Sequence, residues 1–440
     1  MSELFIDENN EVEIDIQKKY TFPEELSFCE YEGKYLIIYT QGCLWLVFNT
    51  QEEVEIFKRL QSGSTIEEVL NDFNHDVVIS VLTQIEAKDF EHPAIKKHPG
   101  KGMFIYLTNN CNEHCKHCYM YAGDLKFEEL SAQQWMTIIS EFRKAGGQAV
   151  TFSGGEVTVY PDFDKIIKHA HSEGLNVTVL SNGILWSEER IADLSNSING
   201  IQISLDGYDK NSYFAVRQFD GFEAALNTAK KFSLTKTHVS IAVTPLYDDL
   251  DLFIEKFENF GRELLKEYPN IKVRFSMELM NGRNICASDN KNKIFKEKVL
   301  ALMERFYPNF YTDNFFLNYI DYNVKSNCGF GEIAVAPNGD VFWCNRIFDL
   351  KSTMNITKVP FEQIIKKSEE IKISTDVNHS KICSKCDIKY LCCGDCRIHY
   401  PGIKEVDSFS GMWENECPSG TKDYFYKKMI DSNEFFYIKR

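Results

Sequence analysis

The sequence contains no long run of apolar residues. Its longest apolar stretch, residues 43–48, is far shorter than the ~18 residues that suggest a membrane-spanning helix. Residues 1–16 are acidic and lack both the basic and the apolar region of a secretory signal. We therefore expect no membrane span and a cytoplasmic location, where reducing conditions disfavour disulfides.

Positive charge is also scarce. The chain carries 49 Lys and Arg against 65 Asp and Glu, a formal net charge of −16. Such a field repels phosphate backbones, so nucleic acid is not an expected partner. With 440 residues, 43% of them hydrophobic, the chain has enough apolar material for two or three folded domains.

Cysteine, by contrast, is abundant and unevenly placed. Three of the 14 cysteines lie between positions 111 and 118, and eight lie between 328 and 417. Cysteines clustered in this way in a reducing compartment indicate metal ligands or catalytic thiols. Cys29 and Cys43 have apolar neighbours in predicted strands, so we expect both to be core residues.

The first part of the chain has the pattern of a small domain, predicted to span residues 1–95. Three short strands are expected at 26–31, 34–39 and 43–48, followed by helices at 51–60, 66–73 and 77–90. Thr50 and Thr65 are suitable N-caps for the first two helices. Residues 92–102 are rich in Pro, Gly and Lys and are predicted to be a linker.

Strands and helices then alternate over a second domain, predicted at 103–285. Strands are expected at 103–108, 148–152, 176–180, 201–205, 239–244 and 272–277, with helices between them, for example at 133–144 and 222–232. This alternation predicts a parallel sheet, open or partly closed, with functional loops at the carboxyl ends of its strands. The repeat is expected to stop after Arg283, leaving a bridging segment at 286–327 and a cysteine-rich domain at 328–440.

The loop after the first of these strands carries Cys111, Cys115 and Cys118, followed by Tyr119. Three thiolates suit a 4Fe-4S cluster whose fourth iron is open to amine and carboxylate groups. The alternative is a zinc site with His114 or His117 as the fourth ligand. The C-x3-C-x2-C spacing on this loop resembles the radical S-adenosylmethionine (SAM) enzymes, and this resemblance implies that SAM binds at the cluster.

Turns after the next three strands agree with that resemblance. It implies that the Gly154-Gly155-Glu156 turn contacts the methionyl amine of SAM, that Ser204 and Arg217 bind its carboxylate, and that Asn182 lies near its ribose. Glycines would let backbone carbonyls approach the amine, and the Glu156 carboxylate would help to neutralise it. The complete set of expected SAM contacts is Tyr119, Gly154, Gly155, Glu156, Ser181, Asn182, Ser204, Asp206 and Arg217.

Seven C-terminal cysteines resemble the SPASM domain, which carries two auxiliary 4Fe-4S clusters, so that three clusters are expected in all. The resemblance implies one cluster on Cys328, Cys344 and Cys396, and another on Cys383, Cys386, Cys392 and Cys417. The first is one ligand short, since Tyr322 stands where related enzymes have a cysteine; we expect Cys286 to fill the place, with a substrate group as the alternative. Cys393 is a spare thiol, and a zinc ribbon at 383–396 is the alternative for that segment.

The front domain resembles the winged-helix-like domain with which peptide maturases bind a precursor's leader, through an extended segment that adds a strand to a sheet edge. A DNA-binding winged helix is the alternative. Its third helix would contain residues 76–90, which hold one Lys and three acidic residues, too little positive charge to bind phosphates.

Together these features predict an α/β fold: a partial (β/α)6 radical SAM barrel, an N-terminal winged-helix-like α+β domain and a C-terminal SPASM domain. The resemblance implies an oxidoreductase that installs a carbon-carbon or thioether crosslink in a ribosomally made precursor peptide. Closing a crosslink removes two hydrogens, so an auxiliary cluster would accept an electron. An electron donor such as flavodoxin or ferredoxin is an expected partner.

Three alternatives remain. Sulfatase-type formylglycine formation uses an aspartate as base directly after the second auxiliary cysteine, where this chain has Asn345, which cannot act as a base. Peptide epimerisation needs no net oxidation and explains the auxiliary clusters less well. A non-catalytic iron-sulfur or zinc regulator would leave the SAM-binding turns without a role.

Overall fold

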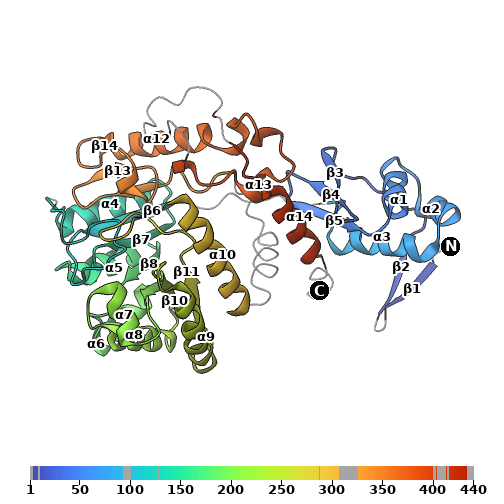
Figure 1. The fold of residues 1–440 in the computed structure, drawn as a ribbon. Helices are drawn as coiled ribbons and strands as arrows, with labels where there is room; N and C mark the ends of the chain where they lie inside the picture. Colours follow the sequence, from blue (N-terminus) through green and yellow to red (C-terminus); the bar gives the residue numbers. More distant parts are fainter. Residues whose placement is uncertain are drawn as a thin grey trace.

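The structure, a computed structural model, describes residues 3–7, 10–92, 101–126, 128–286, 288–306, 326–399, 403, 413 and 416–433. Most of the predicted linker at 92–102 lies outside these residues. The chain forms an N-terminal domain, a central barrel and a C-terminal region that contacts both (Figure 1). Among the described residues, no helix is long and apolar enough to span a membrane.

The N-terminal domain has the predicted order of three antiparallel strands and three helices. Its elements are β3 (Leu26–Tyr31), β4 (Lys34–Tyr39), β5 (Leu44–Phe48), α1 (Gln51–Gln61), α2 (Ile66–Asp72) and α3 (His75–Ala87). Thr50 and Thr65 cap α1 and α2 as expected: each hydroxyl accepts a hydrogen bond from the N–H of a glutamate three residues on, and the glutamate side chain bonds back. A further hairpin, β1 (Glu3–Asp7) and β2 (Asn10–Ile14), precedes the domain and was not predicted.

The central region contains the six predicted parallel strands, side by side in chain order. They are β6 (Gly102–Thr108), β7 (Ala149–Gly154), β8 (Asn176–Ser181), β9 (Gly200–Ser204), β10 (His238–Val243) and β11 (Ile271–Phe275). The intervening helices are α4 (Ala132–Lys144), α5 (Phe163–Ser172), α6 (Glu188–Leu194), α7 (Lys210–Arg217), α8 (Phe222–Ser233) and α9 (Leu250–Glu267). Because the strands are parallel, their carboxyl ends all meet at one edge of the sheet, where the motif loops lie.

The repeat continues one helix further than predicted. Residues after Arg283 were expected to form an irregular bridge, but α10 (Asp289–Phe306) packs on the barrel, where the Phe306 ring lies 6.0 Å from Phe257 and 5.8 Å from Phe275 between centroids. The apolar positions of α10 are separated by many Lys and Asn residues, which obscured its period in the sequence. Residues 307–325 of the proposed bridge, including Tyr322, lie outside the described residues.

The C-terminal region extends the barrel sheet. Strand β12 (Ile333–Val335) pairs in parallel with β6, and β13 (Asp340–Phe342) and β14 (Met354–Asn355) continue the sheet antiparallel. Helices α12 (Phe361–Ser374), α13 (Lys389–Cys392) and α14 (Thr421–Asp431) follow, although this region was expected to have little regular structure. The short 3-10 helices are η1 (Val157–Val159), η2 (Ser195–Ser197), η3 (Ile347–Asp349), η4 (Val377–His379), η5 (Cys383–Lys385) and η6 (Arg397–His399).

The N-terminal sheet is covered on both faces. Helices α1 to α3 cover one face, and α13 and α14 of the C-terminal region cover the other (Figure 1). On this second face the buried Trp45 indole donates a hydrogen bond to the Met429 carbonyl at 3.0 Å, and the Thr40 hydroxyl donates one to the Asp387 carbonyl at 2.9 Å. The N-terminal domain is therefore packed directly against the cysteine-rich part of the chain.

Candidate active site

The thiols of Cys111, Cys115 and Cys118 lie on the loop that follows β6. Cys115 is buried and the other two are half-buried. Burial is the main reason that the pKa of Cys111 is raised to about 12 and that the pKa of Cys115 is raised as well. Thiols with such pKa values stay protonated at neutral pH unless a metal cation takes the place of the proton.

A loop from the far end of the barrel holds this cysteine loop in place. The Arg283 guanidinium donates hydrogen bonds to the Cys115 carbonyl at 2.9 Å and to the Ala122 carbonyl at 2.6 Å. Gly282 lies so close that a Cβ on it would stand 2.7 Å from the His117 carbonyl. Arg283 was missed in the sequence because its partners lie more than 150 positions away.

Gly154 and Gly155 bring the end of β7 against the cysteine loop. A Cβ on Gly154 would stand 2.3 Å from the Thr108 carbonyl oxygen, and one on Gly155 would stand 2.3 Å from the Asn110 carbonyl oxygen. Gly154 also has a φ of 144°. No side chain fits at either position, so the two glycines allow the strand ends to meet.

Glu156 is buried and joins the ends of β7 and β8. Its carboxylate accepts hydrogen bonds from Ser181 Oγ at 2.8 Å, from the Asn182 backbone N–H at 2.6 Å, and from the hydroxyl and N–H of Thr158. Burial raises the pKa of Glu156, and these donors oppose the rise. The predicted contact of Glu156 with a SAM amine stays a prediction.

Arg217, at the end of α7, lies in a buried network of charges. Its Nε is 2.7 Å and its Nη2 2.6 Å from Asp206 Oδ2, and its Nη1 donates to Glu113 Oε2 at 2.9 Å. The Tyr213 hydroxyl donates to the other Glu113 oxygen at 2.7 Å. Burial opposes the charged guanidinium, yet the two carboxylates outweigh burial, and the pKa of Arg217 is raised.

Ser204, the other predicted carboxylate contact, is half-buried at the end of β9, the strand that leads to Asp206. Glu113 and Tyr213 were not predicted as site residues. Glu113 could have been suspected from its position inside the cysteine motif, because a charged side chain there must be either exposed to solvent or paired with an opposite charge.

Three buried polar atoms near the cysteine loop have no hydrogen-bond partner among the described residues: Asn109 Oδ1, Asn112 Nδ2 and His117 Nδ1. Burial lowers the pKa of His117, while Asp206, 3.3 Å from its Nε2, opposes that shift. A neutral imidazole and two amides are therefore available to a polar ligand. The thiols and these unpaired groups fit a cluster with SAM bound beside it.

No three Cys, His, Asp or Glu side chains in the described part of the chain surround one point as the ligands of a single metal ion do. The same holds for the two zinc sites considered as alternatives, one on the first cysteine loop and one at residues 383–396. In a 4Fe-4S cluster each thiolate binds a different iron atom, so the thiolates need not surround one point.

Burial is the main reason that the pKa values of Cys344, Cys392 and Cys396 are raised. Among the smaller causes, Cys328 raises the pKa of Cys344 and Cys396, and Cys383 and Cys417 raise the pKa of Cys392. The assignment of these cysteines to two clusters stays a prediction. Cys386, the remaining predicted ligand of the second set, donates its backbone N–H to the Cys383 carbonyl at 2.9 Å, and burial raises the pKa of its thiol to about 11.

Cys286 is exposed, just after the Gly282–Ile285 bridge that packs on the first cysteine loop. Its role as fourth ligand of the first auxiliary cluster stays a prediction.

A pocket of about 390 Å³ is lined by residues that neighbour two groups of cysteines in the sequence, although no cysteine is among its described lining residues. Arg346 lines this pocket and pairs with two other lining residues, with Nη1 3.3 Å from Glu278 Oε2 and Nε 2.7 Å from Asp349 Oδ2. The other lining residues include Tyr119 and Tyr121 from the loop after Cys118, and His399, which follows Cys396. The lining residues thus include sequence neighbours of Cys118 and of Cys344 and Cys396.

Comparison with known proteins identifies the central region. Residues 105–252 match the family model described as the radical SAM superfamily. Over 174 residues the chain is 33% identical to the sporulation killing factor maturation protein SkfB of Bacillus subtilis (strain 168), an alignment that covers 38% of this chain and 42% of that protein. The chain thus matches less than half of this curated relative's length.

Two solved structures share the fold over more of the chain. Native anSMEcpe with bound AdoMet has a TM-score of 0.55 at 18% identity, covering 77% of this chain and 98% of that one. Streptococcus suis SuiB bound to precursor peptide SuiA has a TM-score of 0.50 at 15% identity, covering 86% of this chain and 96% of that one. At these identities the likeness is one of fold.

Proposed function

We propose, from the radical SAM domain at residues 105–252, that this chain is a peptide maturase that crosslinks a ribosomally made precursor. The family implies SAM and a 4Fe-4S cluster, here held by Cys111, Cys115 and Cys118. When bound, they supply a 5′-deoxyadenosyl radical that abstracts a hydrogen atom. The similarity to a maturation protein and to a fold seen with a bound precursor peptide favours a peptide substrate.

The pocket lined by Tyr119, Arg346 and His399 supports this proposal. A peptide side chain in it would lie beside Tyr119, next to Cys118, and beside Arg346, two residues after Cys344. Forming a crosslink removes two hydrogens: one leaves as an atom, and the other as an electron and a proton. In this proposal Cys328, Cys344 and Cys396 would hold an electron-accepting cluster, and Glu278 and His399, which line the pocket, are groups able to take the proton.

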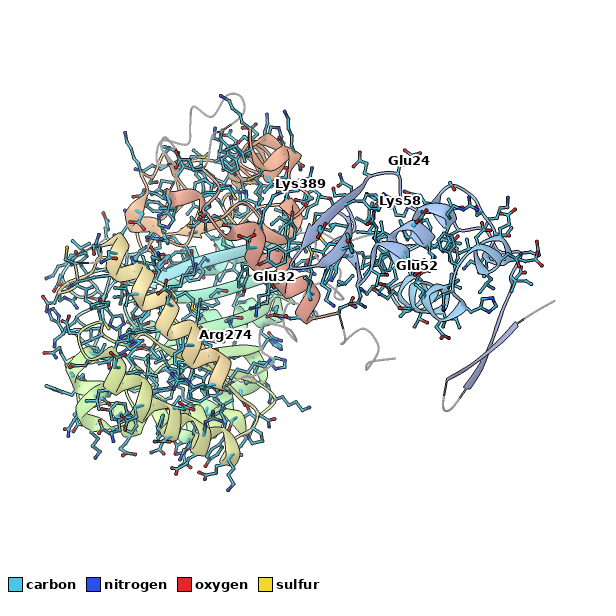
Figure 2. All side chains as sticks on the ribbon, turned by 45° about the vertical axis from the view of Figure 1, so that its right-hand side comes forward. Glu24, Glu32, Glu52, Lys58, Arg274 and Lys389 are labelled. Carbon is cyan, nitrogen blue, oxygen red and sulfur yellow. The ribbon has the colours of Figure 1, made fainter. Side chains whose placement is uncertain are left out.

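Among the described residues β3 pairs only with β4, so its other edge is a candidate site for a leader peptide. All five residues of β5 are buried, and the Gln84 side chain of α3 pairs with both the N–H and the carbonyl of Val47. No residue of β3 is fully buried. An extended leader would therefore add to β3, near the 43% exposed Phe28, whose ring centroid lies 5.4 Å from the Lys58 ammonium. Figure 2 labels Lys58 on the N-terminal domain.

Two measurements test the proposal. The first is anaerobic reconstitution with iron and sulfide, followed by dithionite and SAM; the absence of 5′-deoxyadenosine with loaded clusters would contradict SAM cleavage. The second adds the peptide encoded by a short reading frame beside this gene. A product lighter by two hydrogens is expected, and an unchanged or isomeric peptide mass would contradict crosslinking.

A further inference from the structure

Glu113 links the cysteine loop to the arginine expected to bind SAM. It stands two residues from both Cys111 and Cys115, and its carboxyl group is within 3.6 Å of the Cys115 sulfur. Its side chain is 1% exposed, so its charge is almost fully removed from water. A carboxylate in such a place must be paired, and its partners, Arg217 and Tyr213, both belong to α7.

The network holds the guanidinium from two sides. Asp206, after β9, contacts Nε and Nη2, while Glu113 contacts Nη1 from the cysteine loop. Asp206 is itself fixed, since its other oxygen accepts the Thr244 backbone N–H at 2.6 Å. A guanidinium carries five N–H groups, so these three contacts leave two for the carboxylate of a ligand.

The same contacts hold the cysteine loop against α7. The Lys116 backbone N–H donates to the Val216 carbonyl at 2.9 Å, one residue before Arg217. Glu113 and Lys116 thus attach the loop to one end of α7 at two points. This attachment fixes the position of the Arg217 side chain relative to the cysteines of the loop.

We propose that Glu113 is a positioning residue for SAM: it sets the distance and orientation between the cluster loop and the Arg217 guanidinium. This rests on the proposed function, because SAM must reach the open iron and Arg217 at the same time. Without the Glu113 carboxylate, the Arg217 guanidinium would keep Asp206 but would lose its own contact with the loop, and only the Lys116–Val216 backbone hydrogen bond would attach α7 there. The cluster loop and the Arg217 guanidinium would then no longer be held at the distance and orientation that SAM requires.

The test is SAM affinity, measured by equilibrium dialysis on protein loaded with iron and sulfide. Glu113→Gln keeps the shape of the side chain and removes its charge, and we expect it to weaken SAM binding about tenfold, the effect of losing one charge-assisted hydrogen bond. The control is Glu141→Gln on α4, an exposed carboxylate far from the motif loops, which should bind SAM as the wild type does.

Two further readouts separate positioning from stability. Glu113→Gln should retain wild-type iron content, and the SAM-dependent change in the EPR spectrum of its reduced cluster should require about tenfold more SAM. SAM affinity within about twofold of wild type, at equal iron content, would overturn the proposal.

If Glu113→Gln does not fold or does not load iron, the SAM affinity of Tyr213→Phe tests the proposal instead. This variant frees one carboxylate oxygen and keeps the ion pair, and a SAM affinity about threefold weaker is expected, whereas unchanged affinity overturns the proposal. Failure of the loaded wild type to bind SAM would instead contradict the proposed function.

Discussion

Single residues shape this site in two ways: glycines allow backbone segments to approach closely, and buried charged side chains form hydrogen bonds that join strand ends. Gly154 and Gly155 are required by carbonyl oxygens that leave no room for a methyl group. Glu156 accepts four hydrogen bonds inside the protein, so its visible role is to join two strand ends. The turn expected to contact SAM thus also holds the sheet edge together.

Replacing Cys115 with alanine removes one of the three proposed thiolate ligands of the SAM cluster. We expect 5′-deoxyadenosine formation to be abolished and about four of the roughly twelve iron atoms expected for three clusters to be lost. Liquid chromatography of the nucleoside and an iron assay measure both effects. Cys29→Ala, which changes a thiol in the N-terminal domain, should leave both at wild-type levels; SAM cleavage by Cys115→Ala would rule out this ligand.

Gly155→Ala should destabilise the barrel by about 1–3 kcal/mol, the usual cost of an overpacked site, because the new methyl group would collide with the Asn110 carbonyl. Thermal unfolding of the iron-free protein measures the effect as a lower Tm. Gly102→Ala on β6 is the matched control, since its Cβ would meet Glu332 at an ordinary 3.5 Å. Equal Tm values for the two variants would contradict the close approach.

At the level of elements, the two edges of the N-terminal sheet differ. The β3–β4 turn, Glu32-Gly33, has positive φ at both positions, 49° and 72°, as a two-residue hairpin turn requires. From the register next to this turn, hydrogen-bonded and non-hydrogen-bonded pairs alternate along β3. The backbone groups of Phe28 and Glu30 therefore point away from β4, toward an added strand.

Glu30→Pro should weaken binding of the precursor peptide at least about tenfold, because proline removes an outward N–H while remaining compatible with an edge strand. Fluorescence anisotropy with the peptide from the neighbouring reading frame measures the affinity. Glu30→Ala removes the same carboxylate and keeps the N–H, so it should bind normally. If the two variants bind the peptide equally well, the leader does not pair with this edge.

Across the whole molecule, the domains form one connected structure. Strand β12 joins the barrel sheet at β6, and the N-terminal sheet packs on α13 and α14, next to Cys386 and Cys392. Removing the N-terminal domain would expose Ile388, Leu391 and Met429, which are now buried. Truncation would therefore affect more than peptide binding.

A chain lacking residues 1–95 should still cleave SAM, because the barrel and its cysteine loop remain, but it should not process the precursor peptide. We also expect it to lose about four iron atoms, since the second auxiliary site loses its apolar cover. 5′-Deoxyadenosine, peptide mass and iron content are the three measurements. Peptide turnover at the wild-type rate would refute the leader-binding role of the domain.

The sequence alone determined the features that depend on local pattern. The six barrel strands, the three front strands and the caps at Thr50 and Thr65 were all predicted, because side-chain period and capping are set by residues a few positions apart. The cysteine groups could also be proposed, since the spacing of ligands within a loop can be read directly from the sequence. Helix α10 was missed because polar residues interrupt its apolar face.

Only the tertiary structure decided which distant groups meet. The pairing of Glu113 with Arg217, the packing of Gly282 on His117 and the pocket that joins Tyr119 to His399 each bring together segments about 100 or more positions apart, beyond the reach of any local pattern. In the part of the chain that the structure describes, β3 is the edge that pairs only with β4, whereas long-range packing by α3 covers β5. Local sequence patterns therefore determined the strands, the caps and the cysteine motifs, and packing between distant segments determined which of their side chains meet in the site.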